Sequence, residues 1–389
     1  MKKILFAVES YYPQISGVPV VVKYLAEGLA SDLDYEVHVA TRIDSGLKEV
    51  ELFNEVTIHR FNLNYDFLKR TKGELDKYKK FLFEEKFDCI ILECTQSVTT
   101  DYILKVADSL DTKLILHSHG FSGLALKPFE IMSSFKHTLG NTRNYFVWKY
   151  YYKNFLPRYL KFIDNIITLS AVDNDYLYFK KLNRYVDILP NAADPWFFDN
   201  QICNHIKEYT LIDVNNYFIS IAYYSDVKNQ IGILEQYYKF SNDNNYSMIF
   251  IGTEKNNYYE KLIRLKGYFD KKYGNRNVFF LTNVKRSDIS GILSGAKLYL
   301  SGSRREAFSI SLIESMALGI PFVATNVGNS SVLPGGIVVD DISNMHKKME
   351  KLIKEEELYN DLSIKGRKYS RQFFRVDVAI NTLKKIIEK

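Results

Sequence analysis

The 389-residue chain has few cysteines and no long apolar segment. Its three cysteines, Cys89, Cys94 and Cys203, form neither a CxxC pair nor a disulfide framework, which is typical of reduced thiols in the cytoplasm. The apolar runs have the length of strands, and none approaches the roughly 20 residues of a membrane-spanning helix. The basic start, Lys2-Lys3, is not followed by the longer apolar region of a signal peptide. We therefore expect a cytoplasmic protein.

The chain lacks the sequence motifs of several classes of enzymes and binding proteins. The chain has no GxSxG element, no P-loop, no nucleic-acid-binding motif and no repeat of solenoid length. No set of histidines, cysteines and carboxylates has the spacing of metal ligands along the sequence. The triplet Asp173-Asn-Asp175 has the form of an Asp-x-Asp metal motif, but an N-cap at the start of a helix explains it. We therefore expect no metal, no cofactor and no nucleic-acid partner.

The net charge of +6 is unevenly placed along the chain. Up to Asp194 the chain holds 25 basic and 25 acidic residues, so the excess lies behind that point. Within the front half, however, residues 113–161 contain eight basic residues and one acidic residue, Glu130. Such a local excess indicates an anionic partner or surface.

The pattern of apolar residues predicts an α/β protein of two domains. Strand-like runs alternate with helical stretches of 10 to 15 residues, which is typical of parallel sheets with right-handed crossovers. The series starts at residues 3–10 and starts again at residues 216–225. A segment rich in turn residues, 187–201, separates the two series. We expect two Rossmann-like, doubly wound domains that face each other across a cleft, 1–192 and 193–373, with a C-terminal helix at about 374–389 that returns to the first.

One block, KLYLSGSRREAFSISLIESMALGIPFVAT at residues 297–325, reads as strand, loop, helix and strand. In one continuous helix, Glu306 and Glu314 would lie about 12 Å apart along the axis, too far to share a proton. If the helix starts near Ser309, Glu306 lies in the loop, and the free amides of Ser309 and Ile310 form an anion site. The alternative is structural, because Ser311 and Glu314 have the spacing of a capping box, which needs no ligand.

The block resembles the Glu-x7-Glu motif of the retaining glycosyltransferases of family 4, which have the GT-B fold and are common in bacteria. The likeness rests on Glu306, Phe308, Ser309, Leu312 and Glu314, followed by MALGIPFVAT. It implies that Glu314 holds the ribose of a nucleotide sugar, that Glu306 lies at the reacting sugar, and that the amides after Phe308 bind the diphosphate. Ala307 stands where the family usually has glycine.

Five further segments, in order along the chain, resemble the same family. They imply a donor-phosphate contact at Gly17, a catalytic histidine at His119, a hinge at Pro190 and Asn191, a cation for the diphosphate at Lys228, and backbone contacts to the base at Asn283 and Val284. His117 alternates with His119 on the expected strand, where a histidine of the core or of the cleft wall is the ordinary interpretation.

The chain departs from the family where an arginine commonly precedes the lysine by five residues, because it has Tyr223 there. Arg304 or Arg305 could supply the missing cation, or both could be solvated loop charges. In the second case the leaving diphosphate has one cation fewer than is usual.

The resemblance implies a metal-independent, retaining hexosyltransferase that uses a nucleoside-diphosphate sugar, with a UDP-sugar favoured. The expected acceptor is a glycan or a lipid-linked sugar of bacterial surface polysaccharide. The mixed aromatic and basic segment 148–162 suits the inner face of an anionic membrane, or is an ordinary helix that packs its aromatic side chains on the sheet. Two alternatives stay open: a synthase for a small soluble sugar or sugar-phosphate acceptor, and a non-catalytic partner that binds nucleotide sugar or glycan.

Overall fold

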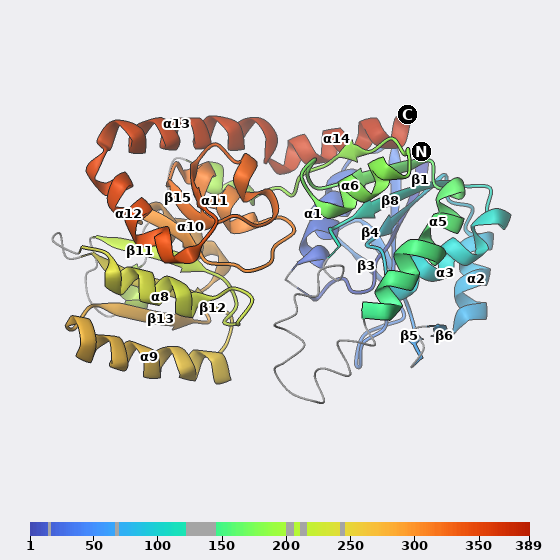
Figure 1. Cartoon of the computed structure of the whole chain (residues 1–389). Helices are drawn as coiled ribbons and strands as arrows, with labels where there is room; N and C mark the ends of the chain where they lie inside the picture. Colours follow the sequence, from blue (N-terminus) through green and yellow to red (C-terminus); the bar gives the residue numbers. More distant parts are fainter. Residues whose placement is uncertain (15–16, 67–69, 122–144, 200–205, 211–215, 242–245) are drawn as a thin grey trace. The chain divides into compact units, whose positions relative to one another are not determined.

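The computed structural model describes the whole chain except residues 15–16, 67–69, 122–144, 200–205, 211–215 and 242–245 (Figure 1). It divides into two compact units, Met1–Pro190 with Ala379–Lys389, and Asn191–Val378. The division falls two residues before the position expected from the sequence, between the two predicted hinge residues, Pro190 and Asn191. The C-terminal segment returns to the first unit five residues later than expected, at Ala379.

The first unit is built on an eight-stranded sheet with the strand order β10-β9-β8-β7-β1-β2-β4-β3. All neighbours pair in parallel except β3 and β4, which form an antiparallel hairpin at one edge. A separate two-stranded sheet is formed by β5 and β6. The strands are β1 Lys2–Ala7, β2 Tyr35–Arg42, β3 Val50–Phe53, β4 Val56–Phe61, β5 Leu63–Tyr65, β6 Thr71–Gly73, β7 Cys89–Glu93, β8 Lys113–Ser118, β9 Asn165–Thr168 and β10 Asp187–Ile188.

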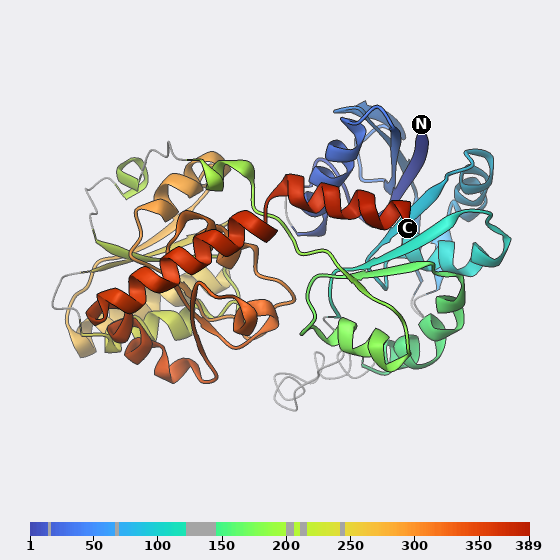
Figure 2. The same ribbon diagram turned by 90° about the horizontal axis from the view of Figure 1, so that it is seen from above.

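Helices cover the sheet of the first unit and close its core. The inner strands β7 and β8 are almost wholly buried and carry apolar runs, Ile90 to Leu92 and Leu114 to Leu116, as is typical of parallel strands covered on both faces. The C-terminal helix packs on the same unit (Figure 2), where Lys384 pairs with Asp32 and Lys113 donates to the carbonyl of Ile387 at 3.0 Å. The helices are α1 Val18–Ala30, α2 Leu75–Glu84, α3 Val98–Val106, α5 Leu156–Tyr159, α6 Asn174–Lys181 and α14 Val376–Glu388.

The second unit contains a six-stranded parallel sheet with the order β13-β12-β11-β14-β15-β16. The strand order reverses between β11 and β14, which makes this pair the switch point of a doubly wound sheet. The strands are β11 Tyr217–Ile221, β12 Ser247–Gly252, β13 Val278–Thr282, β14 Leu298–Ser301, β15 Phe322–Thr325 and β16 Gly336–Val339. The helices are α7 Ile206–Thr210, α8 Gln230–Lys239, α9 Asn257–Tyr273, α10 Arg286–Ser294, α11 Ile310–Leu318, α12 Met345–Lys354 and α13 Glu356–Phe373.

The sequence accounts for the element that carries the Glu-x7-Glu block. Helix α11 ends at Leu318 because Gly319 adopts a left-handed conformation with φ 72°, and Pro321 follows two residues later. All residues from Leu312 to Leu318 are buried. The helix therefore belongs to the core of the second unit, and its first turn is fixed against the sheet.

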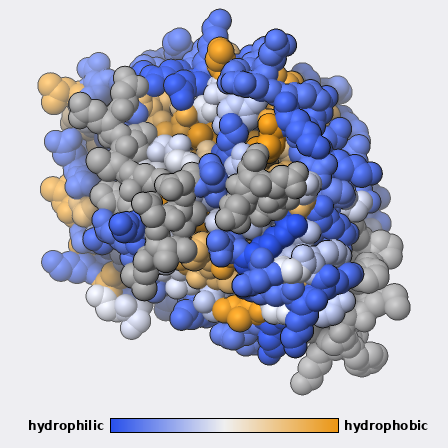
Figure 3. All heavy atoms as spheres, turned by 90° about the vertical axis from the view of Figure 1, so that its left-hand side faces the viewer, coloured by the Kyte–Doolittle hydropathy of each residue, from blue (hydrophilic) through white to orange (hydrophobic). Residues whose placement is uncertain are grey.

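The side of the molecule drawn in Figure 3 is mostly hydrophilic, with apolar atoms in small separate patches. Among the helices that the structure describes, none combines the length and the apolar character needed to cross a membrane.

Candidate functional site

The predicted site residues of the second unit lie in loops at the carboxyl ends of its strands, except Ile310 and Glu314, which lie in α11. Lys228 follows β11, Asn283 follows β13 and Glu306 follows β14. In doubly wound sheets, ligands bind at this edge, next to the switch point. Because β11 and β14 are neighbours, the loops of Lys228 and Glu306 are brought together by the strand order itself.

Lys228 and Glu306 form an ion pair between Nζ and Oε2. Both side chains are mostly buried, with 17% and 18% of their surface exposed. The Lys228 ammonium also lies 5.6 Å from the centre of the Tyr223 ring, within the range of a cation–π contact. The structure thus joins the predicted diphosphate cation and the predicted sugar-side carboxylate, which are 78 residues apart in the sequence.

The loop that carries Glu306 packs against the segment that begins at the end of β15. Gly328 has φ +55°, and a Cβ atom there would lie 2.6 Å from the Ala307 carbonyl and 2.8 Å from the Glu306 carbonyl. Thr325 Oγ1 donates to the Ser303 carbonyl at 2.5 Å. The loop after β14 therefore depends on a close backbone approach that only glycine permits.

The expectation of two free amides at the start of α11 is wrong for Ser309. The Ser309 amide donates to Asn329 Oδ1 at 3.1 Å, so it is used inside the protein. Ile310 is the first helical residue, and its amide has no acceptor within the helix because of its position. Phe308 is buried and its ring contacts Phe374 edge to face at 5.8 Å, so it anchors the loop. The anion site at the start of α11 therefore has one free amide, that of Ile310, where two were predicted.

The capping-box alternative is also wrong. Ser309, not Ser311, is the N-cap, and it makes no side-chain capping bond. The Ser311 hydroxyl lies 2.7 Å from the Tyr299 hydroxyl, and the Glu314 carboxylate pairs with Arg286. A capping box does not explain Glu314.

Glu314 lies almost fully buried in an ionic network, with 1% of its surface exposed. Arg286, the first residue of α10, binds Glu314 through Nη2 and binds Asp194 Oδ2 through Nε at 3.0 Å and Nη2 at 2.8 Å. Burial raises the pKa of Glu314 to about 7, while the Arg286 guanidinium acts in the opposite direction. The carboxylate predicted to bind the ribose therefore changes its protonation state near neutral pH.

Arg286 is a site residue that the sequence analysis missed. The sequence indicated a functional role for Arg286 only through its position, because it follows Asn283 and Val284 and is the first residue of the next helix. Asn283 adopts a left-handed conformation with φ 58°, which asparagine tolerates better than most residues. The turn after β13 thus presents backbone at Asn283 and directs Arg286 to Glu314.

Arg304 and Arg305, the two candidates for the missing cation, are both exposed. The Arg304 amide donates to the Val227 carbonyl at 2.7 Å, and its Nη2 lies 3.4 Å from Asn229 Oδ1. Arg304 is therefore fixed beside the turn that carries Lys228. Tyr223, at the position of the usual arginine, is half exposed.

In the first unit, the predicted site residues lie at the carboxyl ends of β1 and β8. Gly17 is the N-cap of α1, with φ +66° and no atom within 4 Å of a Cβ placed on it. His119 directly follows β8, and its Nε2 lies 2.5 Å from Oε2 of Glu93, the last residue of β7. His117 is buried, with its Nδ1 3.1 Å from the same oxygen.

The three residues Glu93, His117 and His119 also have the spacing of a metal site, which the sequence did not show because Glu93 comes from another strand. Their potential ligand atoms all lie within 4.8 Å of one another, and no other such group exists among the described residues. Two ligands of a tetrahedral zinc ion with bonds of about 2.0 Å would lie about 3.3 Å apart. The 2.5 Å contact between Nε2 and Oε2 is instead the distance of a short hydrogen bond.

Asp173 occupies the N-cap position of α6, as the sequence predicted, but makes no side-chain capping bond. Asp173 and Asp175 are both buried, and each keeps one carboxylate oxygen without a partner in the described structure. Burial and the neighbouring Asp175 raise the pKa of Asp173 to about 7. The two carboxylates therefore add negative character at the ends of β8 and β9.

The segment 148–162 packs most of its aromatic side chains inward, although Tyr150 is exposed. Tyr151 and Tyr152 are buried in the core of the first unit, where the Tyr151 hydroxyl donates to Asp101 Oδ1 at 2.5 Å. Lys149, Lys153 and other basic residues of the segment are exposed. This is the arrangement of an ordinary helix lying on a sheet, which was the structural alternative.

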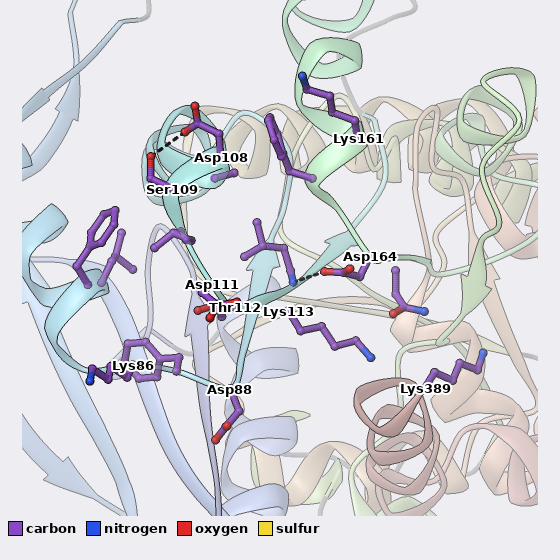
Figure 4. Close-up of a pocket in the computed structure, with 18 residues that line it drawn as sticks. Lys86, Asp88, Asp108, Ser109, Asp111, Thr112, Lys113, Lys161, Asp164 and Lys389 are labelled. Carbon is purple, nitrogen blue, oxygen red and sulfur yellow. Dashed lines mark hydrogen bonds between the residues drawn. The ribbon is translucent and has the colours of Figure 1, made fainter.

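A hollow of the first unit, with a volume of about 1280 Å³, lies at the amino ends of the strands, opposite to the predicted site residues (Figure 4). Lys113 begins β8, Asn165 begins β9 and Asp88 precedes β7. Lysines and aspartates line it together, so neither charge sign prevails. Its place at the amino ends of the strands separates it from the candidate site.

Comparison with known proteins places the chain in a class. Residues 15–197 match the family model Glycosyltransferase Family 4, and residues 204–369 match Glycosyl transferases group 1. The chain is therefore a glycosyltransferase of the GT-B type, and it is family 4-like. A curated relative, the N-acetyl-alpha-D-glucosaminyl L-malate synthase of Bacillus anthracis, is 22% identical over 208 residues. The match spans 52% of this chain and about half, 53%, of that relative.

Solved structures confirm the expected GT-B fold. The sucrose-phosphate synthase of Thermosynechococcus elongatus superposes with a TM-score of 0.75 at 14% identity, covering 100% of this chain and 98% of the other. The Anabaena protein HepE, solved with UDP and glucose, gives a TM-score of 0.70 at 16% identity, with 100% of both chains covered. At such low identity these structures establish the fold alone.

The contact below the Glu306 loop gives a test of the site's construction. We expect Gly328→Ala to lower the free energy of unfolding more than Gly46→Ala, because Gly46 also has a positive φ, +84°, but has open space around a Cβ. Both variants carry backbone strain of about 1–2 kcal/mol, and Gly328→Ala adds an overpacking cost of about 1–3 kcal/mol. Urea denaturation measures both, and equal losses would contradict the close approach at Gly328.

Proposed function

We propose that the protein is a retaining, metal-independent hexosyltransferase that moves a sugar from a nucleoside-diphosphate sugar to a glycan or lipid-linked acceptor. The observation that carries the proposal is the pairing of Lys228 with Glu306 at the switch point of the second unit, beside the start of α11. A UDP-sugar is the favoured donor, and HepE, a solved neighbour with the same fold, was obtained with UDP and glucose. Synthesis of bacterial surface polysaccharide, at the cytoplasmic face of the membrane, is the proposed setting.

In the proposed reaction, the bond between the anomeric carbon and the diphosphate breaks as charge grows on the leaving oxygen. A new bond forms from the acceptor oxygen on the same face, and the acceptor proton passes to the diphosphate. Lys228, the Ile310 amide and a backbone contact at Gly17 stabilise the leaving group electrostatically. Arg304, beside the Lys228 turn, is the better placed of the two candidates for a second cation. No protein base and no metal take part.

The carboxylates have separate roles in this proposal. Glu314 accepts hydrogen bonds from the ribose hydroxyls, and Glu306 lies at the sugar and positions Lys228. Asn283 and Val284 contact the base through the backbone, and Ala307 to Ile310 form the wall of the diphosphate site. His119 acts on the sugar or the acceptor. Movement at Pro190 and Asn191 would exclude water during transfer.

A second candidate function is synthesis of a small soluble product. It is favoured by two similar proteins that are synthases, the N-acetyl-alpha-D-glucosaminyl L-malate synthase and the sucrose-phosphate synthase. Small acceptors assayed beside glycan and lipid-linked acceptors would distinguish the two functions. Co-sedimentation with anionic vesicles at low salt tests the membrane, and no binding there would remove the inner-face setting.

The donor site can be tested by binding. We expect Glu314→Ala and Lys228→Ala each to weaken UDP affinity at least about tenfold, because each removes a charged contact worth about 1.5–3 kcal/mol. His119→Ala should leave UDP affinity nearly unchanged and lower kcat. Calorimetry measures the affinities, and unchanged affinity in both Glu314→Ala and Lys228→Ala would refute the donor site. Slow donor hydrolysis by the pure wild-type protein would argue against a silent binding partner.

The pH dependence of nucleotide binding follows from Glu314. Its pKa is raised to about 7, so the carboxylate is largely ionised at pH 8 and largely protonated at pH 6. Since the ionised form accepts both ribose hydroxyls, UDP affinity should fall about tenfold from pH 8 to pH 6. Glu314→Gln is the control, because it keeps the titration of the phosphates and loses this carboxylate. The same pH dependence in both proteins would show that Glu314 is not responsible.

Stereochemistry provides an independent test of mechanism. Proton NMR of the first product formed from a UDP-α-sugar should show the α configuration at the new linkage. A β product would exclude the retaining mechanism while leaving the donor site intact.

A further inference from the structure

The histidine proposed to act in transfer does not stand alone at the end of β8. Its Nε2 lies 2.5 Å from Glu93 Oε2, and its ring centre lies 4.0 Å from that of His117. Glu93 and His117 are register partners on the adjacent strands β7 and β8, and His119 follows two residues later on the same side. The strand pairing thus places one carboxylate against two imidazoles.

Glu93 is completely buried, so its charge must be compensated by neighbouring groups. Burial by itself would raise the pKa of Glu93, but the two histidines hold it down at about 2. An ionised carboxylate can only accept hydrogen bonds. The nitrogen that is hydrogen-bonded to it, Nε2 of His119, therefore carries a proton. Nδ1 of His117 lies 3.1 Å from the same oxygen but makes no hydrogen bond.

The other ring nitrogen of His119 has a different environment. Among the described residues, none forms a hydrogen bond with Nδ1. Nδ1 also does not belong to the fully buried polar atoms that lack a partner. Burial, with His117 beside it, lowers the pKa of His119, so the ring is neutral near pH 7. A neutral ring with its proton on Nε2 presents a lone pair at Nδ1.

We propose that Glu93 is a positioning residue, which fixes His119 as the Nε2–H tautomer and so makes Nδ1 an acceptor for a hydroxyl group of the sugar or the acceptor substrate. The predicted effect of Glu93 on turnover rests on the proposed transfer reaction. The predicted tautomer of His119 does not. Glu93 itself does not touch the substrate. It acts as the carboxylate behind the imidazole, which orients the ring and stabilises any positive charge that it gains.

The groups around Glu93 and His119 belong to several helices, strands and loops. The Cys94 thiol accepts from the His119 amide, and Glu9, after β1, acts on Cys94 through its charge. Asp175, at the start of α6, is buried near Ser118 and Gly120, which lie on either side of His119. Any change in the titration of His119 must therefore be measured against these groups, which a substitution at Glu93 leaves in place.

Glu93→Gln is the sharpest variant, because its amide oxygen can still accept from Nε2 while the charge is lost. We expect kcat at saturating donor to fall about 10- to 100-fold, with the donor KM changed less than about threefold. Glu93→Asp, which keeps the charge, should lose less. Glu36→Gln is the matched control, since Glu36 Oε1 lies 2.7 Å from His38 Nε2 in a similar pair elsewhere on the sheet, and kcat should not change.

The pH profile separates positioning from a structural role. Protonation of Nδ1 removes the acceptor, so kcat should fall on the acid side. The Glu93 charge raises the pKa of His119, and therefore Glu93→Gln should move this acid limb to lower pH. A variant that merely loosened the fold would lower kcat without moving the limb. A limb that stays in place would overturn the proposal.

The tautomer is tested on the protein without substrate. Side-chain ¹⁵N NMR of histidine-labelled protein, with the His119 signals assigned by their loss in His119→Gln, should show a protonated Nε2 and an unprotonated Nδ1 at pH 7.5. An Nδ1–H tautomer, or stoichiometric zinc whose removal by a chelator abolishes activity, would overturn the proposal. Should the NMR result be as expected while no donor and acceptor pair supports transfer, the proposed function fails and the positioning of His119 stands.

Discussion

The ion pair between Lys228 and Glu306 is the interaction on which the candidate donor site depends. Each residue lies on a loop that alone has no reason to fold toward the other. The sheet brings the loops together, because β11 and β14 are neighbours at the point where the strand order reverses. The loop of Glu306 also relies on Gly328, whose missing Cβ allows the backbone after β15 to support it. The pair therefore joins two loops into one preorganised anion-binding wall.

The same constraint, charge buried at the carboxyl edge of a parallel sheet, recurs in both units. Glu93 is stabilised by His117 and His119, and Glu314 by Arg286. In each case the carboxylate is almost free of solvent and would be costly without its partner. The outcomes differ, because Glu93 stays ionised with a pKa of about 2 whereas Glu314 titrates near 7. One carboxylate is suited to fix a histidine, and the other to respond to a ligand and to pH.

Much of the fold could be predicted from local patterns. The two series of alternating strands and helices, which begin at β1 and β11, the strand, loop, helix and strand of β14, α11 and β15, and the return of the C-terminal helix follow from apolar periodicity and turn residues. The strands β3 to β6, β10 and β16 were not predicted. All of them except β4 are only two to four residues long, and they lie at or near the edges of the large sheets or form the small separate sheet. The ordered family motifs also predicted the glycosyltransferase class, which the matches to both halves of the chain confirm.

The sequence by itself determined the α/β architecture, the positions of Glu306, Lys228 and His119 in loops or at strand ends, and the position of Glu314 within a helix, because these depend on short-range periodicity and spacing. Only the tertiary structure decided which side chain meets which. Arg286 with Glu314, Asn329 with the Ser309 amide and Glu93 with His119 join residues at least 20 positions apart. Such contacts depend on strand order and on the cost of burying an unpaired charge, neither of which is encoded in the residues next to them.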